Sequence, residues 1–540
     1  MITIENGPEA LGLPGESELA RLANALWNEG TAGLASAPAP GAAVSPVTDH
    51  PVASVPEAAS TPVAVFPAVS ASEIPYQPSI PHIGNPLHLQ PTPEQSDERN
   101  TIRVAVRDGR TDAGQDSLYA LSDRVNGTHT RRDDGITVGS KTLAQIREDF
   151  PILKEQVGGF PLVWLDNGAT TQKPQCVIER LTQFYTHENS NVHRGAHELA
   201  ARSTDAYENA RQIAADFIGA PDKDDVVFVR GTTEGINLVA NAYVKPLLTP
   251  GDEIILSILE HHANIVPWQL IAAETGAVLR VIPCDESGQL IIPEYERLFT
   301  PRTKFVSVTQ VSNVLGTVTP VEELVTIAHR HGVPILIDGA QSVAHMPVDV
   351  SALDADFFVF SGHKIFAPTG IGAVYGKKAL LDAARPYHGG GNMIKDVTFE
   401  RTIYNPAPNK FEAGTGSIAD AVGLGEALSY LSSIGMPAVH QWEQELVQYG
   451  MKELATVPGL HLIGTAPGKA SALSFKLDGY EDNAVGEYLN RYGIAVRTGH
   501  HCAQPVLRRF GLESVVRPTL AVYNSPEDID ALVKALRGLA

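Results

Sequence analysis

Short apolar runs alternate with amphipathic stretches through most of the chain from about residue 140 onward. Each run predicts a strand, because it holds only a few apolar residues between turn-forming segments. Alternation at this spacing predicts an α/β fold with a large, mostly parallel sheet and helices on both faces. After about Ser433, the pattern predicts a helix and shorter strands, which indicate a smaller α+β C-terminal domain. The strand-like runs are Asp225–Val229, Glu253–Ser257, Val278–Ile282, Phe305–Thr309, Pro334–Ile337 and Phe357–Phe360.

Residues 1–137 have a different pattern. From Ala35 to Pro93 the chain consists largely of Ala, Pro, Ser, Val and Thr, and such frequent prolines exclude helices and interior strands. This stretch buries too little apolar surface to offset its ordering entropy, which predicts a disordered arm. Apolar clusters at about residues 17–30, 74–83 and 116–121 are interpreted as docking motifs. The alternative for residues 17–30 is an amphipathic helix that packs on its own catalytic domain.

The chain has 540 residues, which exceeds the usual capacity of one hydrophobic core. We expect a large domain at residues 161–432 and a small domain formed by residues 138–160 together with 433–540. A net charge of −21 argues against nucleic acid or an anionic membrane as a partner. No apolar run is long enough to span a bilayer. Three widely separated cysteines form neither a disulfide framework nor a zinc-binding pattern, so we expect no metal and a reducing cytoplasm.

Lys364 is the first candidate for chemistry. It follows the apolar run Phe357–Phe360 in the segment Ser-Gly-His-Lys and precedes a loop rich in Pro and Gly. Desolvation disfavours the ammonium form of a lysine in such a place. A neutral amine can condense with the aldehyde of pyridoxal 5'-phosphate (PLP). An isolated segment of this kind more often holds an exposed lysine, so this interpretation depends on the rest of the chain.

Other segments supply the parts that a PLP site needs. The segment Arg230–Asn237, with Thr232 and Thr233, follows a strand and opens a helix, so its free N–H groups face an incoming phosphate. Asp338 follows another strand, at the edge of the sheet where ligands bind, and its charge would keep the pyridine nitrogen protonated. Each feature alone is more often structural. The remaining candidates are Gln341 for the phenolic oxygen, His261 for stacking on the ring, and Ser361 with His363 as phosphate donors.

Cys502 lies in a loop with Arg497 and two histidines. These basic neighbours favour the thiolate, which is the nucleophilic form of cysteine. The alternative, a small buried hydrophobe, is favoured for Cys176 and Cys284. Arg517 presents a fork suited to a substrate carboxylate, and its alternative is a surface ion pair.

Residues 140–540 resemble a group II cysteine desulfurase of the Suf type, which is a PLP enzyme of fold type I. Several sequence motifs carry the resemblance. They occur in the same order as in the family, and they include both Lys364 and Cys502. The runs are Asn191–Gly195, Arg230–Asn237, Glu260–Asn264, Ser312–Thr317, Asp338–Gln341, Ser361–Lys364 and Arg497–Pro505.

The resemblance implies that L-cysteine is converted to L-alanine, with Lys364 as the Schiff-base lysine and Cys502 as the persulfide carrier for a sulfur-acceptor protein. It implies a catalytic and stacking role for His261. It also implies a homodimer, in which Thr415 reaches the phosphate of the partner subunit. Thr232, Thr233, Ser361 and His363 would then bind the phosphate, Asp338 and Gln341 the ring, and Asn313, Arg517, His193, Arg194 and Arg497 the substrate.

The chain departs from the family pattern in three places. Gly416-Ser417 replaces the usual Pro-Asn, and Pro518-Thr519 replaces the commoner Ala-Ser. Both changes could reshape the substrate entrance without removing a reactive group. Asn483 stands where relatives that exchange zinc with their acceptor carry a histidine, which argues against such an acceptor.

The N-terminal arm resembles that of cysteine desulfurases packed as cargo inside encapsulin shells. This resemblance implies a cytoplasmic enzyme located in an encapsulin nanocompartment. Within the same fold, the alternatives are a selenocysteine lyase and a cysteine sulfinate lyase. The alternative from another class is a catalytically idle cargo or scaffold protein, against which Lys364, Asp338 and Cys502 argue.

Overall fold

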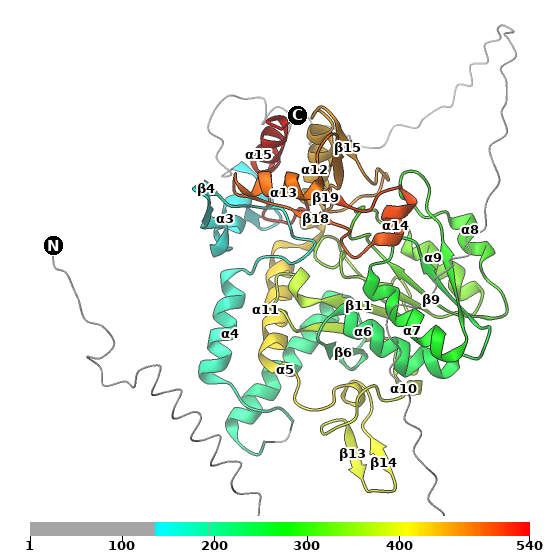
Figure 1. Cartoon of the computed structure of the whole chain (residues 1–540). Coiled ribbons are helices and arrows are strands. Elements are labelled where there is room, and N and C mark those ends of the chain that lie inside the picture. Colours follow the sequence, from blue (N-terminus) through cyan, green and yellow to red (C-terminus); the bar gives the residue numbers. More distant parts are fainter. Residues whose placement is uncertain (1–134, 194, 540) are drawn as a thin grey trace, which may run out of the picture. The chain divides into compact units, whose positions relative to one another are not determined.

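The computed structural model describes residues 135–193 and 195–539 (Figure 1). The three predicted docking motifs and Arg194 lie outside the described residues. None of the described helices is long and apolar enough to cross a membrane.

A seven-stranded sheet forms the centre of the described structure. The strand order is β6-β12-β11-β10-β9-β7-β8. All strands run parallel except β12, which is antiparallel to both of its neighbours. The predicted α/β fold with a mostly parallel sheet is therefore confirmed. The strands are β6 (Val226–Val229), β7 (Glu253–Ser257), β8 (Val278–Ile282), β9 (Thr303–Thr309), β10 (Ile335–Asp338), β11 (Phe357–Ser361) and β12 (Gly372–Gly376).

Strand β12 is the one strand of this sheet that the hydrophobic pattern did not predict. It begins and ends with glycine, which is unusual for a strand interior. A Cβ atom on Gly372 would lie 2.5 Å from the carbonyl oxygen of Phe360 and 2.6 Å from the Cα atom of Gly231. Glycine is therefore required for β12 to approach the two segments that flank the site.

Helices cover the central sheet, and α4, α5 and α11 lie side by side along one side of it (Figure 1). Helix α11 is buried along most of its length, as expected for a helix packed between other elements. Helix α6 follows β6 and continues as a π-helical turn, Val239–Val244. The helices of this part are α4 (Gln175–His187), α5 (Glu198–Phe217), α6 (Thr232–Leu238), α7 (Val266–Thr275), α8 (Ile292–Arg297), α9 (Val321–Arg330), α10 (Lys378–Ala383) and α11 (Ile418–Ile434).

The C-terminal part contains an antiparallel sheet of order β15-β16-β19-β18. The segment that precedes α4 contacts the same C-terminal part, since Arg147 donates to the carbonyl oxygen of Tyr523 over 2.7 Å. The strands are β15 (Leu460–Leu462), β16 (Phe475–Leu477), β18 (Arg497–Gly499) and β19 (Val515–Arg517); the helices are α3 (Leu143–Glu148), α12 (Met436–Leu454), α13 (Asp482–Asn490), α14 (Gln504–Arg509) and α15 (Pro526–Arg537).

Short strand pairs complete the described structure. Strand β5 (Val163–Trp164) pairs in parallel with β17 (Ile494–Ala495) and so joins the start of the described chain to its C-terminal part. The hairpin of β13 (Ile394–Val397) and β14 (Thr402–Tyr404) projects from the lower end of the structure in Figure 1. The other two pairs are β1 (Thr137–Val138) with β2 (Lys141–Thr142) and β3 (Gln156–Val157) with β4 (Phe160–Pro161).

Candidate active site

A cavity of about 260 Å³ lies where the carboxyl ends of the central strands meet the loop after β18. This is the edge at which open α/β sheets bind ligands. Lys364 and Cys502, which are far apart in sequence, line the same cavity. The predicted site residues that line it are Thr232, Thr233, His261, Asn313, Asp338, Gln341, Ser361, His363, Lys364, Arg497, Cys502 and Arg517.

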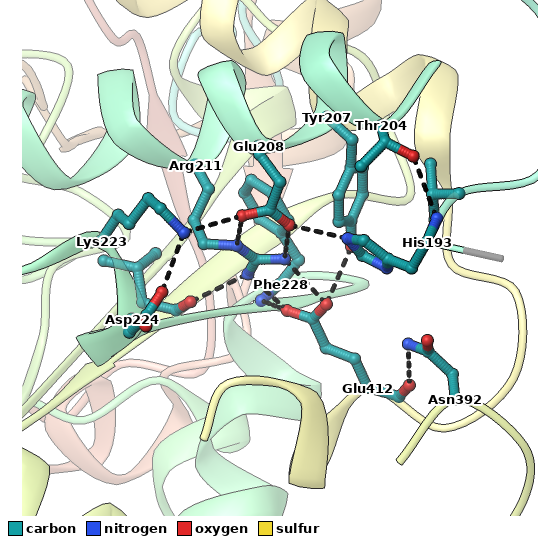
Figure 2. Close-up of polar contacts among 12 residues, drawn as sticks. His193, Thr204, Tyr207, Glu208, Arg211, Lys223, Asp224, Phe228, Asn392 and Glu412 are labelled. Atoms are coloured by element: carbon teal, nitrogen blue, oxygen red, sulfur yellow. Dashed lines mark hydrogen bonds and ion pairs between the residues drawn. The ribbon is translucent and has the colours of Figure 1, made fainter. Parts of the chain in front are cut away.

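Two predicted residues lie away from this cavity. The ring of His193 contacts Glu208, with His193 Nε2 3.0 Å from Glu208 Oε1 (Figure 2). Thr415 is exposed and lines a different cavity, together with Tyr207 and Glu412. Within one protomer, therefore, neither side chain reaches the site of Lys364.

Lys364 and Asp338 both line the cavity, and each affects the pKa of the other. Burial lowers the pKa of Lys364 to about 8, although Asp338 acts in the opposite direction. Asp338 is only 3% exposed, and its Oδ1 accepts a hydrogen bond from the N–H of Ala340 over 2.9 Å. Burial raises the pKa of Asp338, and Lys364 opposes this rise. A buried carboxylate is stabilised by a cation, so a protonated pyridine nitrogen fits this position.

Ser361 and Thr232 shape the predicted phosphate corner. The N–H of Thr232, at the start of α6, donates to Ser361 Oγ over 2.8 Å, and this hydroxyl donates to Thr232 Oγ1 over 2.9 Å. Between them, Gly231 has a φ of 152°, and a Cβ atom there would lie 3.1 Å from Ser361 Oγ. Burial, with help from Lys364, lowers the pKa of His363 to about 4. The corner therefore presents hydroxyls, N–H groups and a neutral imidazole, which are donors that a phosphate accepts.

His261 is held in a single orientation. Its Nδ1 accepts a hydrogen bond from the N–H of Ala263 over 3.0 Å. Burial lowers its pKa to about 3, with Lys364 contributing, so the ring is neutral at physiological pH. Gln341 also lines the cavity, but its Nε2 donates to the carbonyl oxygen of Gly168 over 2.7 Å. Its predicted contact with the phenolic oxygen of the cofactor stays a prediction.

The loop that carries Cys502 is fixed by several contacts. Cys502 has a φ of 56° and His501 a φ of 51°, values that non-glycine residues adopt only where their surroundings enforce them. The N–H of Cys502 donates to His500 Nδ1 over 3.0 Å, and its carbonyl oxygen accepts from the N–H of His262 over 2.7 Å. Asn313 Nδ2 donates to the carbonyl oxygen of His501 over 2.6 Å. The thiol is therefore presented from a defined backbone position.

Arg517 is almost fully buried, with 2% of the residue exposed. Its Nη1 donates to the carbonyl oxygen of Asn313 over 2.8 Å, and its Nη2 to Asp166 Oδ1 over 3.2 Å. Arg517 Nε and Asn313 Oδ1 are buried without a hydrogen-bond partner among the described residues. Unpaired buried polar groups are costly. A small ligand with a carboxylate and an amine would offer them partners.

Several residues beside the cavity were not singled out from the sequence. His501 lines it directly, and His262 holds the Cys502 loop; the adjacent histidines in Glu260–Asn264 and Arg497–Pro505 were the available signal. Asp166 pairs with Arg517 and lies two residues after strand β5. Polar residues after a predicted strand would have identified it.

The Pro518-Thr519 departure lies beside Arg517. Thr519 Oγ1 accepts a hydrogen bond from the N–H of Gly168 over 2.8 Å. A Cβ atom on Gly168 would lie 3.0 Å from Thr519 Cγ2 and 3.2 Å from Arg517 Cζ. Thr519 thus supports the cavity wall formed by Gly168. The side chain of Asn483 is also in use, because its Oδ1 accepts from Thr498 Oγ1 over 2.6 Å.

Comparisons with known proteins agree with this geometry. The family described as Aminotransferase class-V matches residues 163–532. A cysteine desulfurase of Synechococcus elongatus is 55% identical over 473 residues, which cover 85% of this chain and 75% of that protein. A probable cysteine desulfurase of Mycolicibacterium paratuberculosis is 60% identical over 398 residues, or 74% of this chain and 58% of that longer protein. A solved cysteine desulfurase of Escherichia coli in an S-sulfonic acid form has 40% identity and a TM-score of 0.69, covering 73% of this chain and 97% of that one.

The chain belongs to the class-V aminotransferase family, and its fold is that of the fold type I PLP enzymes. Relatives at 55% and 60% identity identify its activity as that of a PLP-dependent cysteine desulfurase. The predicted fold class, cofactor and enzyme class are thereby confirmed.

Proposed function

We propose that the protein is a group II, Suf-type cysteine desulfurase that converts L-cysteine to L-alanine and carries the released sulfur as a persulfide on Cys502. A sulfur-acceptor protein then takes this sulfur for iron–sulfur cluster assembly or storage. The observation that supports the proposal best is the single cavity lined by Lys364, Cys502, Asp338 and Arg517. An amine, a thiol, a buried carboxylate and a carboxylate-binding fork are the groups that this reaction needs.

Each residue has one task in this proposal. PLP, when bound, supplies an electron sink for chemistry at the substrate Cα atom. Arg517 binds the substrate carboxylate, and Lys364 accepts the Cα proton. The Cys502 thiolate attacks the substrate sulfur, so an S–S bond forms while the Cβ–S bond breaks. The electrons of the broken bond stay with the carbon skeleton, which takes up one proton at Cβ, regains the Cα proton from Lys364 and leaves as alanine.

A substrate comparison tests this function against its rivals of the same fold. Purified protein is mixed in turn with L-cysteine, selenocysteine and cysteine sulfinate, and alanine and protein-bound persulfide are quantified. We expect alanine from cysteine in the first turnover, with one persulfide per active subunit. Faster alanine release from selenocysteine, without persulfide from cysteine, would favour a selenocysteine lyase. No alanine from any of the three would favour an idle cargo or scaffold protein.

We also propose a homodimer, in which each subunit completes the site of the other. Thr415 is exposed and lies outside the cavity that contains Lys364. Its hydroxyl makes no hydrogen bond to any described residue, so it remains available to a ligand in a second copy. Contact with the partner's phosphate would give this hydroxyl an acceptor.

For residues 1–137 we propose targeting of the cytoplasmic enzyme into an encapsulin shell. The 85% of this chain matched by the Synechococcus relative exceeds the share made up by residues 135–539, so the similarity extends into the arm. Short apolar motifs on a tether gain affinity when many copies meet many sites on a shell wall.

Deleting residues 1–134 tests the role of the arm. This truncation leaves β1 in place, so we expect unchanged alanine production from L-cysteine. We expect co-purification with a co-expressed shell to be lost. The matched control carries an unrelated Pro- and Ala-rich segment of equal length instead of residues 1–134. Equal shell loading of the truncated and full-length proteins would contradict targeting by the arm.

A further inference from the structure

A buried ionic network joins α5 and β6 to Glu412, which lies three residues before Thr415 in the chain (Figure 2). Its centre is Arg211 on α5, whose side chain is 0% exposed. Arg211 Nη1 donates to Glu412 Oε1 over 2.6 Å, and Arg211 Nη2 to Glu412 Oε2 over 2.9 Å. It also donates to the carbonyl oxygen of Val226, in β6, over 2.9 Å. This forked pair joins a helix and a strand of the central sheet to the segment before α11.

Glu412 is bound on several sides. It accepts hydrogen bonds from the N–H of Phe228 over 2.8 Å and from the hydroxyl of Tyr207 over 3.1 Å. Its carbonyl oxygen accepts from Asn392 Nδ2 over 3.1 Å. Three residues later, Thr415 and its neighbours are exposed. The network therefore fixes the base of a segment whose tip faces outward.

The same network holds His193. Glu208 accepts from Arg211 and from Lys223, over 3.3 Å and 3.1 Å respectively, and its Oε1 lies 3.0 Å from His193 Nε2. Burial acts to raise the pKa of Glu208, but the contacts from His193, Arg211 and Lys223 hold it well below its usual range. One cation, Arg211, thus binds both the carboxylate that contacts His193 and the carboxylate three residues before Thr415.

We infer that Arg211, through Glu412 and Glu208, is a positioning residue for the active site of the partner subunit. It sets the place of Thr415, and of His193, where a second copy of this chain would meet them. The inference rests on the proposed homodimer and deepens it, because it names the device that presents the shared residues. A tilt of Glu412 would move the Thr415 hydroxyl away from the partner's phosphate without touching Lys364 of the same chain.

Heterodimers separate this role from a purely structural one. In the first heterodimer, one subunit carries Arg211→Lys and the other Lys364→Ala. Its intact Lys364 site is served by an intact Arg211 in the partner. In the second heterodimer, a wild-type subunit is paired with one that carries both changes, so its intact site is served by the altered network. Lysine keeps the charge but loses the fork, so folding is expected to survive.

Two readouts apply to both heterodimers. The release rate of the lysine-linked cofactor is followed by its visible absorbance, which the Lys364→Ala subunit lacks. The half-saturating PLP concentration for alanine production is measured in parallel. We expect the second heterodimer to release PLP about tenfold faster, the effect of losing one hydrogen bond to a charged group. The first should match the heterodimer of wild type with Lys364→Ala.

Controls make each outcome decisive. Arg280→Lys alters another arginine–glutamate pair, in which Arg280 Nη2 lies 2.6 Å from Glu253 Oε1, and should affect neither heterodimer. Asn392→Gly removes the amide that holds Glu412, and glycine tolerates the φ of 67° at residue 392. It should give the same difference between the two heterodimers, and it replaces Arg211→Lys in the experiment if that variant does not fold.

Equal impairment of both heterodimers, or of neither, would overturn the inference. A monomeric enzyme with full activity would instead overturn the proposed homodimer.

Discussion

Replacing Cys502 by alanine is expected to abolish sulfur release from L-cysteine while the cofactor stays bound. The thiol lines the same cavity as Lys364 but belongs to a separate loop, so its loss leaves the PLP-binding residues in place. Alanine formation should fall by at least about a thousandfold, the scale seen when a nucleophile is removed. The measurements are alanine by chromatography, persulfide by mass spectrometry, and cofactor content by visible absorbance.

The other two cysteines provide matched controls for this variant. Cys284 is 1% exposed, and burial raises its pKa. Burial, together with Glu426, raises the pKa of Cys176 to about 11. Neither thiol lines the cavity, so Cys176→Ala and Cys284→Ala should keep full activity. Selenocysteine is expected to remain a substrate of the Cys502 variant, because selenium leaves more easily than sulfur. Full turnover of cysteine by Cys502→Ala would contradict the assignment of the persulfide.

The hydrophobic pattern predicted the central sheet well for a physical reason. Strands β7 and β8 were predicted with their observed bounds. Strand β7 is buried throughout, as expected for a continuous apolar run in a parallel sheet, whereas β8 is an edge strand and mostly exposed. Strand β12 was not predicted, because its terminal glycines serve close backbone approach rather than burial. The local apolar pattern indicates where a strand forms, but it does not indicate where two backbone segments approach each other closely.

The candidate site was predictable where each residue directly follows a strand. Asp338 ends β10, Ser361 ends β11, and Lys364 follows three residues later, so topology alone brings them to one edge. The contacts that hold the Cys502 loop were not predictable, because His262 and Cys502 are distant in the chain. The place of His193, beside Glu208 and away from the cavity, was also not predictable from the sequence. Thr415 was assigned to the partner subunit only through the family resemblance.

Replacing Lys364 by alanine is expected to have the second large effect. In the proposed mechanism, the variant loses the amine that links PLP and the group that moves the substrate Cα proton. Alanine formation should fall by about a thousandfold, within the range that a positioned proton carrier contributes. The absorbance of the lysine-linked cofactor should be absent. Lys173, which is half-buried and does not line the cavity, gives the control Lys173→Arg, which should keep both activity and absorbance.

The pKa of Lys364 predicts how fast the cofactor-free protein takes up PLP. Only the neutral amine attacks the aldehyde, and burial lowers the pKa of Lys364 to about 8. The neutral fraction is then about one tenth at pH 7 and about nine tenths at pH 9, so the uptake rate should rise about ninefold between them and then level off. Because the carboxylate of Asp338 raises this pKa, Asp338→Asn should move the midpoint to lower pH. Stopped-flow absorbance between pH 6 and pH 10 measures both. A rate that still climbs steeply at pH 10 would mean that Lys364 behaves as an ordinary exposed lysine, and the cavity would not then prepare the amine for its cofactor.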